Sequence, residues 1–380
     1  MSRTAPISRV RAAILWAVVS TTLCLQSCTG GPSKPGVADP VSWDQLTGWT
    51  TDTQSAAWTA LLRSCSRIGR DKAWTATCRA AQGFDKPTDA EARSFFHRHF
   101  RPHPLYGEGG RREGLITGYY VPLLRGSFEP DKRYRYPIYG RPPDLLNIDL
   151  AGVYPALAGR QLRGRVQGRT VVPYPDRAEL QADPQALAGS ELLWVDDPLD
   201  AFFLQVQGSG RVELPDGRVV ALAYADNNGR PYRSIGKCLI KEGKMSREDV
   251  NLFTIRRWLR AHPDEAARIL DCDPRVVFFR VKPGAPGSPE GSLGVPLTAG
   301  RSLAVDRDKI PLGAPIWLET SMPGHSHKPL NRLMMAQDTG GGVRGYTRAD
   351  VFWGEGPKAE RKAGLMKQKG RMFVLLPIRP

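Results

Sequence analysis

The chain has 380 residues, of which 41% are hydrophobic and 24% are charged. This composition is typical of a globular protein and excludes a disordered one, and the length accommodates two domains of ordinary size. The 39 Gly and 32 Pro residues favour a turn-rich, mainly β architecture with flanking helices over a helical bundle. The formal net charge of +16 suits a nucleic acid, an anionic lipid or an acidic polymer, and it is equally consistent with a solvated basic surface.

The first 27 residues are predicted to be a signal peptide. Three arginines precede an apolar stretch over residues 12–25, which is too short to span a bilayer. The stretch ends in LQSC, which resembles a bacterial lipobox and predicts lipidation of Cys28; the alternative is an ordinary secretory signal cleaved nearby. Removal of the three arginines leaves a formal net charge of +13.

Residues 28–42 are predicted to be a lipidated tether, since they are rich in Gly, Pro and Ser. Thr29 occupies the position where an inner-membrane retention signal usually has Asp. We therefore expect the protein on the periplasmic side of the outer membrane of a Gram-negative bacterium, held by its lipid. An exported protein rarely meets DNA and the chain has no nucleic-acid motif, so we expect no nucleic-acid partner.

Four cysteines remain after Cys24 and Cys28 are set aside, and an oxidising compartment permits disulfides between them. Cys65 and Cys78 lie 13 residues apart in one predicted helical hairpin, and we expect them to form a bridge. A bridge between Cys238 and Cys272 is a weaker alternative. No Cys/His spacing indicates zinc, so we expect no metal and no organic cofactor.

Apolar spacing predicts helices over residues 52–81, 89–100 and 246–270, with Asp89 as a helix N-cap. Short β-like runs are separated by turn residues, among which residues 215–217 (PDG) indicate a hairpin. The predicted strands are 115–124, 134–139, 169–173, 201–206, 211–214, 218–224, 278–281, 302–305, 315–318, 333–337 and 372–376. A β-rich centre flanked by helices and followed by a second β-rich stretch predicts an inserted domain.

Two aspartates near the C-terminus are the strongest candidates for chemistry. An apolar strand leads to Asp338 and a glycine-rich turn, and a second short strand carries Asp350 twelve residues later. Two carboxyl groups in one partly buried site raise the pKa of one of them, which gives a proton donor near neutral pH. The alternative is plain turn chemistry, in which Asp accepts backbone N–H bonds. The glycines are not a phosphate loop, because no Gly-Lys-Ser/Thr follows, and no His has a nucleophile context.

Four segments in order resemble the membrane-bound lytic murein transglycosylase A family. They are residues 117–122 (TGYYVP), 202–210 (FFLQVQGSG), 297–306 (LTAGRSLAVD) and 338–354. The lipobox and residues 370–375 (GRMFVL) also match, and the resemblance covers roughly residues 43 to 378. Many members have Glu or Thr where this chain has Val121, so a sugar contact at that position would differ.

The resemblance implies a double-psi β-barrel with a second, inserted β-barrel domain and a glycan groove between them. The catalytic domain would comprise residues 43–118 and 240–380, and the inserted domain residues 119–239. Asp350 matches the catalytic aspartate and Asp338 a supporting carboxylate. The substrate contacts would be Thr117, Tyr120, Gln207 and Ser209.

The implied activity is a lytic transglycosylase that cleaves the bond between N-acetylmuramic acid and N-acetylglucosamine in peptidoglycan and forms a 1,6-anhydro sugar. Three alternatives stay open at this point: a hydrolytic muramidase, a non-catalytic peptidoglycan-binding lipoprotein, and a structural lipoprotein that tethers the wall to the membrane. The expected partners are peptidoglycan glycan strands and, through the lipid, the membrane.

Overall fold

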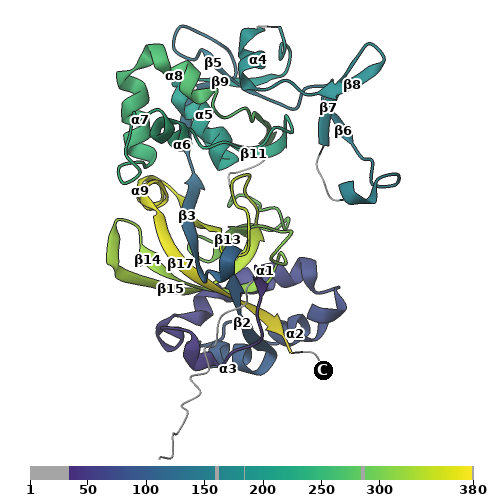
Figure 1. Cartoon of the computed structure of the whole chain (residues 1–380), viewed down its shortest axis with the longest axis vertical. Helices are drawn as coiled ribbons and strands as arrows, with labels where there is room; N and C mark the ends of the chain where they lie inside the picture. The colour runs from purple at the N-terminus through teal and green to yellow at the C-terminus, as the bar shows by residue number, and fades with distance from the viewer. Residues whose placement is uncertain (1–33, 159–161, 184, 284–286, 379–380) are drawn as a thin grey trace, which may run out of the picture. The chain divides into compact units, whose positions relative to one another are not determined.

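The computed structural model describes residues 34–158, 162–183, 185–283 and 287–378. The predicted signal peptide, the predicted lipidation site Cys28 and the first part of the predicted tether lie outside the described residues. The described chain is mainly β with several helices (Figure 1). None of the described helices is both long enough and apolar enough to cross a membrane.

The largest sheet closes on itself. Its strands follow the order β1-β2-β17-β14-β15-β13-β16-β3, and β17 pairs with β3 as well as with β14, which closes a ring of six strands. A closed ring leaves those six strands without a free edge. The strands of this sheet are β1 (Gly36–Val37), β2 (Phe100–Tyr106), β3 (Glu113–Val121), β13 (Ser302–Val305), β14 (Pro315–Met322), β15 (His325–Asp338), β16 (Ala349–Glu355) and β17 (Lys367–Pro377). The double-psi connection within this barrel stays a prediction.

A second, six-stranded sheet lies between β3 and β13 in the sequence, in the order β12-β11-β10-β4-β9-β5. A bridge between Gly140 and Phe279 links its two edge strands. Its strands are β4 (Leu123–Ser127), β5 (Tyr136–Tyr139), β9 (Glu191–Val195), β10 (Ser209–Glu213), β11 (Val219–Asn227) and β12 (Val277–Lys282). The sheet therefore extends beyond residue 239, where the predicted inserted domain ends. A small third sheet contains β6 (Leu146–Ile148), β7 (Leu162–Gln167) and β8 (Thr170–Pro173).

The helices fall into groups along the chain. Those before the barrel strands are α1 (Trp58–Ile68), α2 (Lys72–Gln82) and α3 (Asp89–His99). Those within the stretch that carries the second sheet are α4 (Arg177–Ala182), α5 (Pro198–Gln207), α6 (Ile235–Lys241), α7 (Leu252–Ala261) and α8 (Pro263–Leu270), and α9 (Pro357–Leu365) follows β16. The first group shares one hydrophobic core with the barrel, where Trp49 packs edge-on against Trp317 at a ring-centre distance of 5.0 Å.

Two local predictions were wrong. Residues 201–206 are not a strand but part of α5, which begins with Pro198 and is capped by the Asp197 carboxylate accepting from Leu199 N at 2.8 Å. Proline at the first turn and an Asp cap are strong helix-start signals, and they outweigh the β-like apolar run that follows. The N-cap of α3 is Thr88 rather than Asp89, because Thr88 and Glu91 form a capping box.

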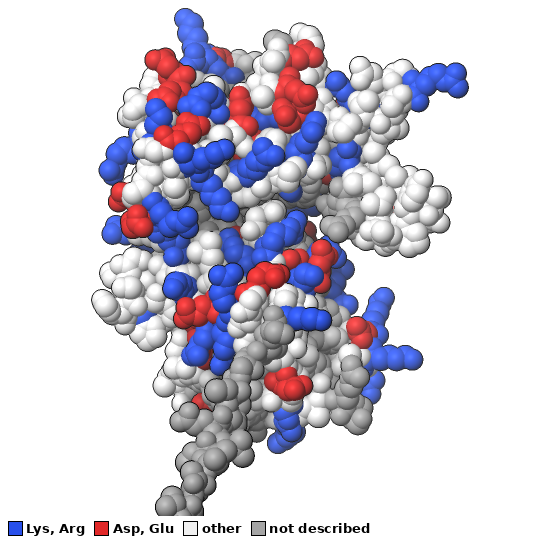
Figure 2. All heavy atoms as spheres, viewed as in Figure 1, with Lys and Arg blue, Asp and Glu red and all other residues white. Residues whose placement is uncertain are grey.

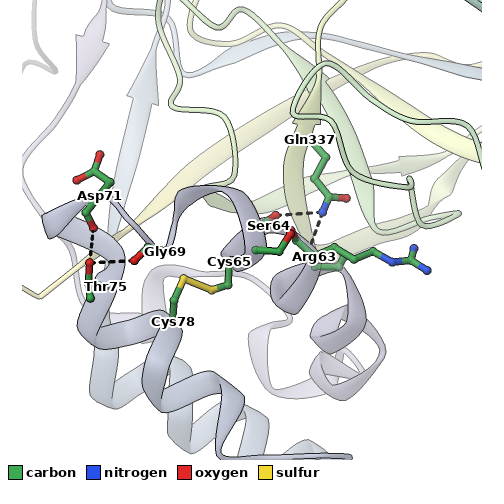
Figure 3. The surroundings of a disulfide bond; sticks show 10 residues. Arg63, Ser64, Cys65, Gly69, Asp71, Thr75, Cys78 and Gln337 are labelled. Atoms are coloured by element: carbon green, nitrogen blue, oxygen red, sulfur yellow. Dashed lines mark hydrogen bonds between the residues drawn. A yellow bond between two sulfur atoms is a disulfide. The ribbon is translucent and has the colours of Figure 1, made fainter.

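A disulfide joins Cys65 in α1 to Cys78 in α2, the pair that the spacing favours (Figure 3). Cys238 and Cys272 are free thiols in the structure. Figure 3 also shows that α1 contacts the last residues of β15: the Gln337 side-chain amide donates to Ser64 Oγ at 3.0 Å and to Ala60 O at 2.8 Å. The bridged helical pair therefore supports the strand that ends at Asp338.

Candidate active site

The strand register of the barrel brings Asp338 and Asp350 to one place. Ala304 in β13 is the ladder partner of Asp338 in β15 on one side and of Asp350 in β16 on the other. On the next strand along, Thr117 in β3 is the partner of Asp350. Since paired residues on neighbouring strands project to the same face of a sheet, the two carboxylates and the Thr117 hydroxyl share one face.

Asp338 is a half-buried carboxylate, and both of its oxygens accept hydrogen bonds. Its Oδ1 accepts from Ser292 N and Ser292 Oγ, both at 2.9 Å, and from Thr339 N at 2.8 Å. Its Oδ2 accepts from the Tyr119 hydroxyl at 2.9 Å. Burial raises the pKa of Asp338, and these donors oppose that rise because they stabilise the ionised form.

Tyr119 remains a proton donor in this pair. Burial raises its pKa well above the ordinary value for tyrosine, and the neighbouring Asp338 carboxylate raises it further. The phenol therefore stays protonated over the physiological range and holds Asp338 in position.

Asp350 has a different environment, in which Oδ1 alone accepts hydrogen bonds from the residues that the structure describes. Its Oδ1 accepts hydrogen bonds from Thr117 Oγ1 and from Arg348 Nη1, and Arg348 Nη2 donates to Thr117 Oγ1 at 2.8 Å. Among the described residues, no hydrogen-bond donor contacts Oδ2, which lies 3.9 Å from the position that a Cβ on Gly340 would occupy. The side chain of Asp350 is 21% exposed, so this oxygen can reach a ligand.

The loop between the two aspartates is anchored at its far end by Asp306. Asp306 is 4% exposed, and its Oδ2 accepts from Gly345 N at 2.7 Å. Gly345 has a φ of 94°, in the left-handed region that disfavours a side chain. Anchored in this way, the loop returns the chain to β16 in the register that places Asp350 beside Thr117.

The predicted substrate contacts lie in different places. Thr117 is beside Asp350, as described above. The Tyr120 side chain is 4% exposed and its hydroxyl donates to Glu360 Oε1 at 2.9 Å, while Tyr120 N donates to Gln207 Oε1 at 3.0 Å. Because neighbouring residues of a strand point to opposite faces, Tyr119 faces the aspartates and Tyr120 faces α9. Ser209 begins β10 and pairs with Ala223. The substrate-binding roles of Tyr120, Gln207 and Ser209 stay predictions.

Three residues of the site are absent from the predicted set: Tyr119, Ser292 and Arg348. The alternation of strand faces is a signal for two of them, since Tyr119 lies two residues after Thr117 and Arg348 two residues before Asp350. Ser292 belongs to a loop between β12 and β13, and its contact with Asp338 depends on the tertiary fold alone. Among the described residues no cluster of three or more His, Cys, Asp or Glu side chains could hold a metal ion.

Two domain-family models match this chain, one over the stretch that carries the second sheet and one over the barrel strands β13 to β17. The model of the MltA specific insert domain matches residues 115–280, and that of the 3D domain matches residues 301–376. The chain is 34% identical to the membrane-bound lytic murein transglycosylase A of Vibrio cholerae over 275 residues, which cover 70% of this chain and 67% of that protein.

Solved structures agree with this assignment. The crystal structure of a membrane-bound lytic murein transglycosylase from Agrobacterium tumefaciens is similar with a TM-score of 0.79 and 30% identity, covering 90% of this chain and 98% of that one. The Escherichia coli MltA with bound chitohexaose is similar with a TM-score of 0.66 and 26% identity, covering 93% and 98%. The chain belongs to the membrane-bound lytic murein transglycosylase A family.

Proposed function

We propose that this chain is a peptidoglycan lytic transglycosylase in which Asp350 is both the acid and the base. The observation that carries the proposal is the barrel register, which places Asp350 and the half-buried Asp338 on one face as ladder partners of Ala304. The family membership supports the reaction class and the substrate, since the curated relatives are lytic murein transglycosylases.

The first step is proton donation by Asp350 to the glycosidic oxygen between N-acetylmuramic acid and N-acetylglucosamine. We assign this proton to Oδ2, because Oδ1 already accepts from Thr117 and Arg348. As the proton leaves, negative charge develops on Asp350, and the Arg348 guanidinium and the Thr117 hydroxyl stabilise it. The C1 atom of the muramoyl unit becomes an oxocarbenium-like centre as the bond breaks.

In the second step the ionised Asp350 removes the proton of the muramoyl C6 hydroxyl, whose oxygen then bonds to C1. The product is a 1,6-anhydro sugar, no water is consumed, and Asp350 regains its proton. The attack is intramolecular, and well-aligned reactions of this kind have effective molarities of about 10⁵ M or more. One carboxyl group can therefore serve in both steps, while Asp338, fixed by Tyr119 and Ser292, supports the loop that carries the site.

The experiment is digestion of purified sacculi by a soluble form that lacks residues 1–28, compared with its Asp350→Asn variant. Loss of a general acid and base lowers the rate by about 10²-fold or more. The matched control is Asp308→Asn, which removes an exposed carboxylate from the same barrel domain and should leave the rate unchanged. Equal activity of wild type and Asp350→Asn would refute the assigned role.

We further propose that Cys28 is lipidated and anchors the protein to the periplasmic side of the outer membrane. The lipobox-like sequence before Cys28 supports the modification, and the membrane-bound character of the family supports the anchor. Each buried CH₂ group of an acyl chain contributes about 0.8 kcal/mol to membrane binding. Mass spectrometry of the mature N-terminus tests this: a diacylglyceryl cysteine at residue 28 is expected, and an unmodified N-terminus at another residue would contradict it.

A further inference from the structure

Arg275 lies against the glycine-rich loop that joins the two aspartates. It precedes β12, so it comes from the part of the chain that carries the second sheet. A Cβ on Gly341 would meet Arg275 Nη1 at 3.1 Å, and a Cβ on the neighbouring Gly340 would lie 3.9 Å from Asp350 Oδ2. The guanidinium is thus placed beside the loop residues that border the proton-donating oxygen.

The backbone of Arg275 is firmly held. The buried Asp273 carboxylate accepts from Arg275 N at 3.3 Å and from Arg233 N at 3.0 Å, and Arg275 O accepts from Arg177 Nη2. Tyr232, from the segment fixed by the same aspartate, packs its ring on the loop as well, at 3.0 Å from a Cβ built on Gly342. The position of Arg275 therefore follows from a network of buried polar contacts.

The guanidinium of Arg275 itself has no carboxylate partner among the described residues, in contrast to Arg348, which is paired with Asp350. The residue is half-buried, and a partly desolvated guanidinium favours a planar anion that it can bind through two hydrogen bonds. Peptidoglycan supplies carboxylates close to the scissile bond, either on the stem peptide of the muramoyl unit or, where the peptide has been removed, on its lactyl group.

We propose that Arg275 is a specificity-determining residue that binds a carboxylate carried by the muramoyl unit at the cleaved bond. The inference rests on the proposed transglycosylase function and adds the feature of the substrate that this chain selects. It distinguishes acidic muropeptide glycans from neutral amino-sugar polymers with the same backbone linkage.

The test compares wild type, Arg275→Gln and Arg275→Lys as full mature chains on three soluble glycan preparations. The first carries stem peptides, the second has been stripped of peptides and exposes lactyl carboxylates, and the third carries stem peptides whose carboxylates have been amidated. Arg169→Gln is the matched control, because it removes the same charge from an exposed position in the β7–β8 turn. Rates are measured as anhydro-product release at several substrate concentrations.

Arg275→Gln removes a charge-assisted contact. We therefore expect it to raise KM roughly tenfold or more on a glycan preparation that presents the bound carboxylate, and to leave kcat nearly unchanged. Arg275→Lys should recover part of the loss, and on the amidated glycan Arg275→Gln should equal wild type. A defect on peptide-bearing strands alone identifies the stem peptide as the source of the carboxylate, and a defect on stripped strands identifies the lactyl group.

Two results would overturn the inference: the same KM for wild type and Arg275→Gln on all three glycans, or an equal loss that includes the amidated glycan. A defect of the same size in Arg169→Gln would also refute it, since the effect would then be one of overall charge. Absence of anhydro products with the wild type on every preparation would instead refute the proposed function, so the two failures are distinguishable.

Discussion

At the scale of single residues, the two aspartates differ in how they are held. Asp338 is half-buried and both of its oxygens accept hydrogen bonds, from Ser292, Thr339 and Tyr119. Asp350 has one oxygen without a described donor. A carboxylate whose two oxygens both accept hydrogen bonds cannot also transfer a proton without losing some of those bonds. We therefore propose that Asp338 has a supporting role and that Asp350 transfers the proton.

The half-buried Asp338 should make stability depend on pH. Burial raises the pKa of Asp338. The native state therefore keeps the carboxyl proton to a higher pH than the unfolded chain, in which Asp titrates at about 3.9. The stability that this group contributes is complete below that pH and is lost as the pH rises through the native pKa. We expect Asp338→Asn, which does not titrate, to gain unfolding free energy relative to wild type as the pH rises through this range. Urea unfolding at a series of pH values measures the difference, and parallel curves would contradict the expectation.

The Tyr119 hydroxyl should matter for turnover through Asp338. Tyr119→Phe removes one hydrogen bond to the half-buried Asp338 carboxylate, and a hydrogen bond to a charged group contributes about 1.5–3 kcal/mol. We expect kcat to fall by roughly tenfold or more, with little change in KM, since no substrate contact is removed. Tyr139→Phe, in β5 of the second sheet, is the control and should keep the wild-type kcat. A change in KM alone for Tyr119→Phe would indicate a substrate contact instead.

At the scale of elements, local patterns predict most strands but not their pairing. The predicted runs at 302–305 and 169–173 correspond to β13 and β8, because short apolar or β-branched runs bounded by turn residues are local signals. The closure of the barrel depends on β17 pairing with both β14 and β3, which are far apart in the sequence, and no local signal specifies it. The strand predicted at 201–206 is the helix α5, whose cap residues precede the apolar run.

The Cys65–Cys78 bridge should stabilise the helical pair that supports β15. A disulfide that closes a loop of about 15 residues contributes about 3 kcal/mol. We expect the Cys65→Ala/Cys78→Ala double variant to lose free energy of unfolding of that order, and therefore to unfold at a lower denaturant concentration. Urea unfolding under non-reducing conditions measures both. Cys238→Ala, which removes a free thiol, is the control. An unchanged midpoint in the double variant would show that the bridge contributes little.

At the scale of the whole molecule, basic side chains outnumber acidic ones by 54 to 38. Figure 2 shows Lys and Arg spread over the visible face with Asp and Glu between them, rather than one continuous basic surface. Attraction to an acidic polymer would then be a long-range effect of net charge, and salt would screen it.

Binding to sacculi should therefore weaken as salt increases. We expect the Asp350→Asn variant, which should not cleave the sacculi, to lose affinity for them several-fold between low and high ionic strength, as measured by co-sedimentation with intact sacculi. Sacculi with amidated carboxylates are the control and should show a much smaller salt effect. Equal salt dependence for both preparations would exclude the peptidoglycan carboxylates as the cause.

The candidate site was predictable in part. Its two aspartates and Thr117 stand in motifs that identify the family, so they could be named from the sequence. The exact partners of Asp338 could not, because Ser292 reaches it from a separate loop and the choice between Tyr119 and Tyr120 depends on which face of β3 meets the barrel site. Arg275 is also beyond prediction, since its approach to the glycine loop follows from the way the second sheet packs.

The most direct test of the central claim, intramolecular attack with Asp350 as acid and base, is digestion of sacculi in water enriched in the heavy oxygen isotope. Mass spectrometry of the released muropeptides reads both the mass of the ends and their isotope content. The mechanism predicts 1,6-anhydro ends, one water lighter than hydrolytic products and free of the heavy isotope, and their loss in Asp350→Asn. Reducing ends that carry the heavy isotope would mean that water is the nucleophile, and would contradict the mechanism.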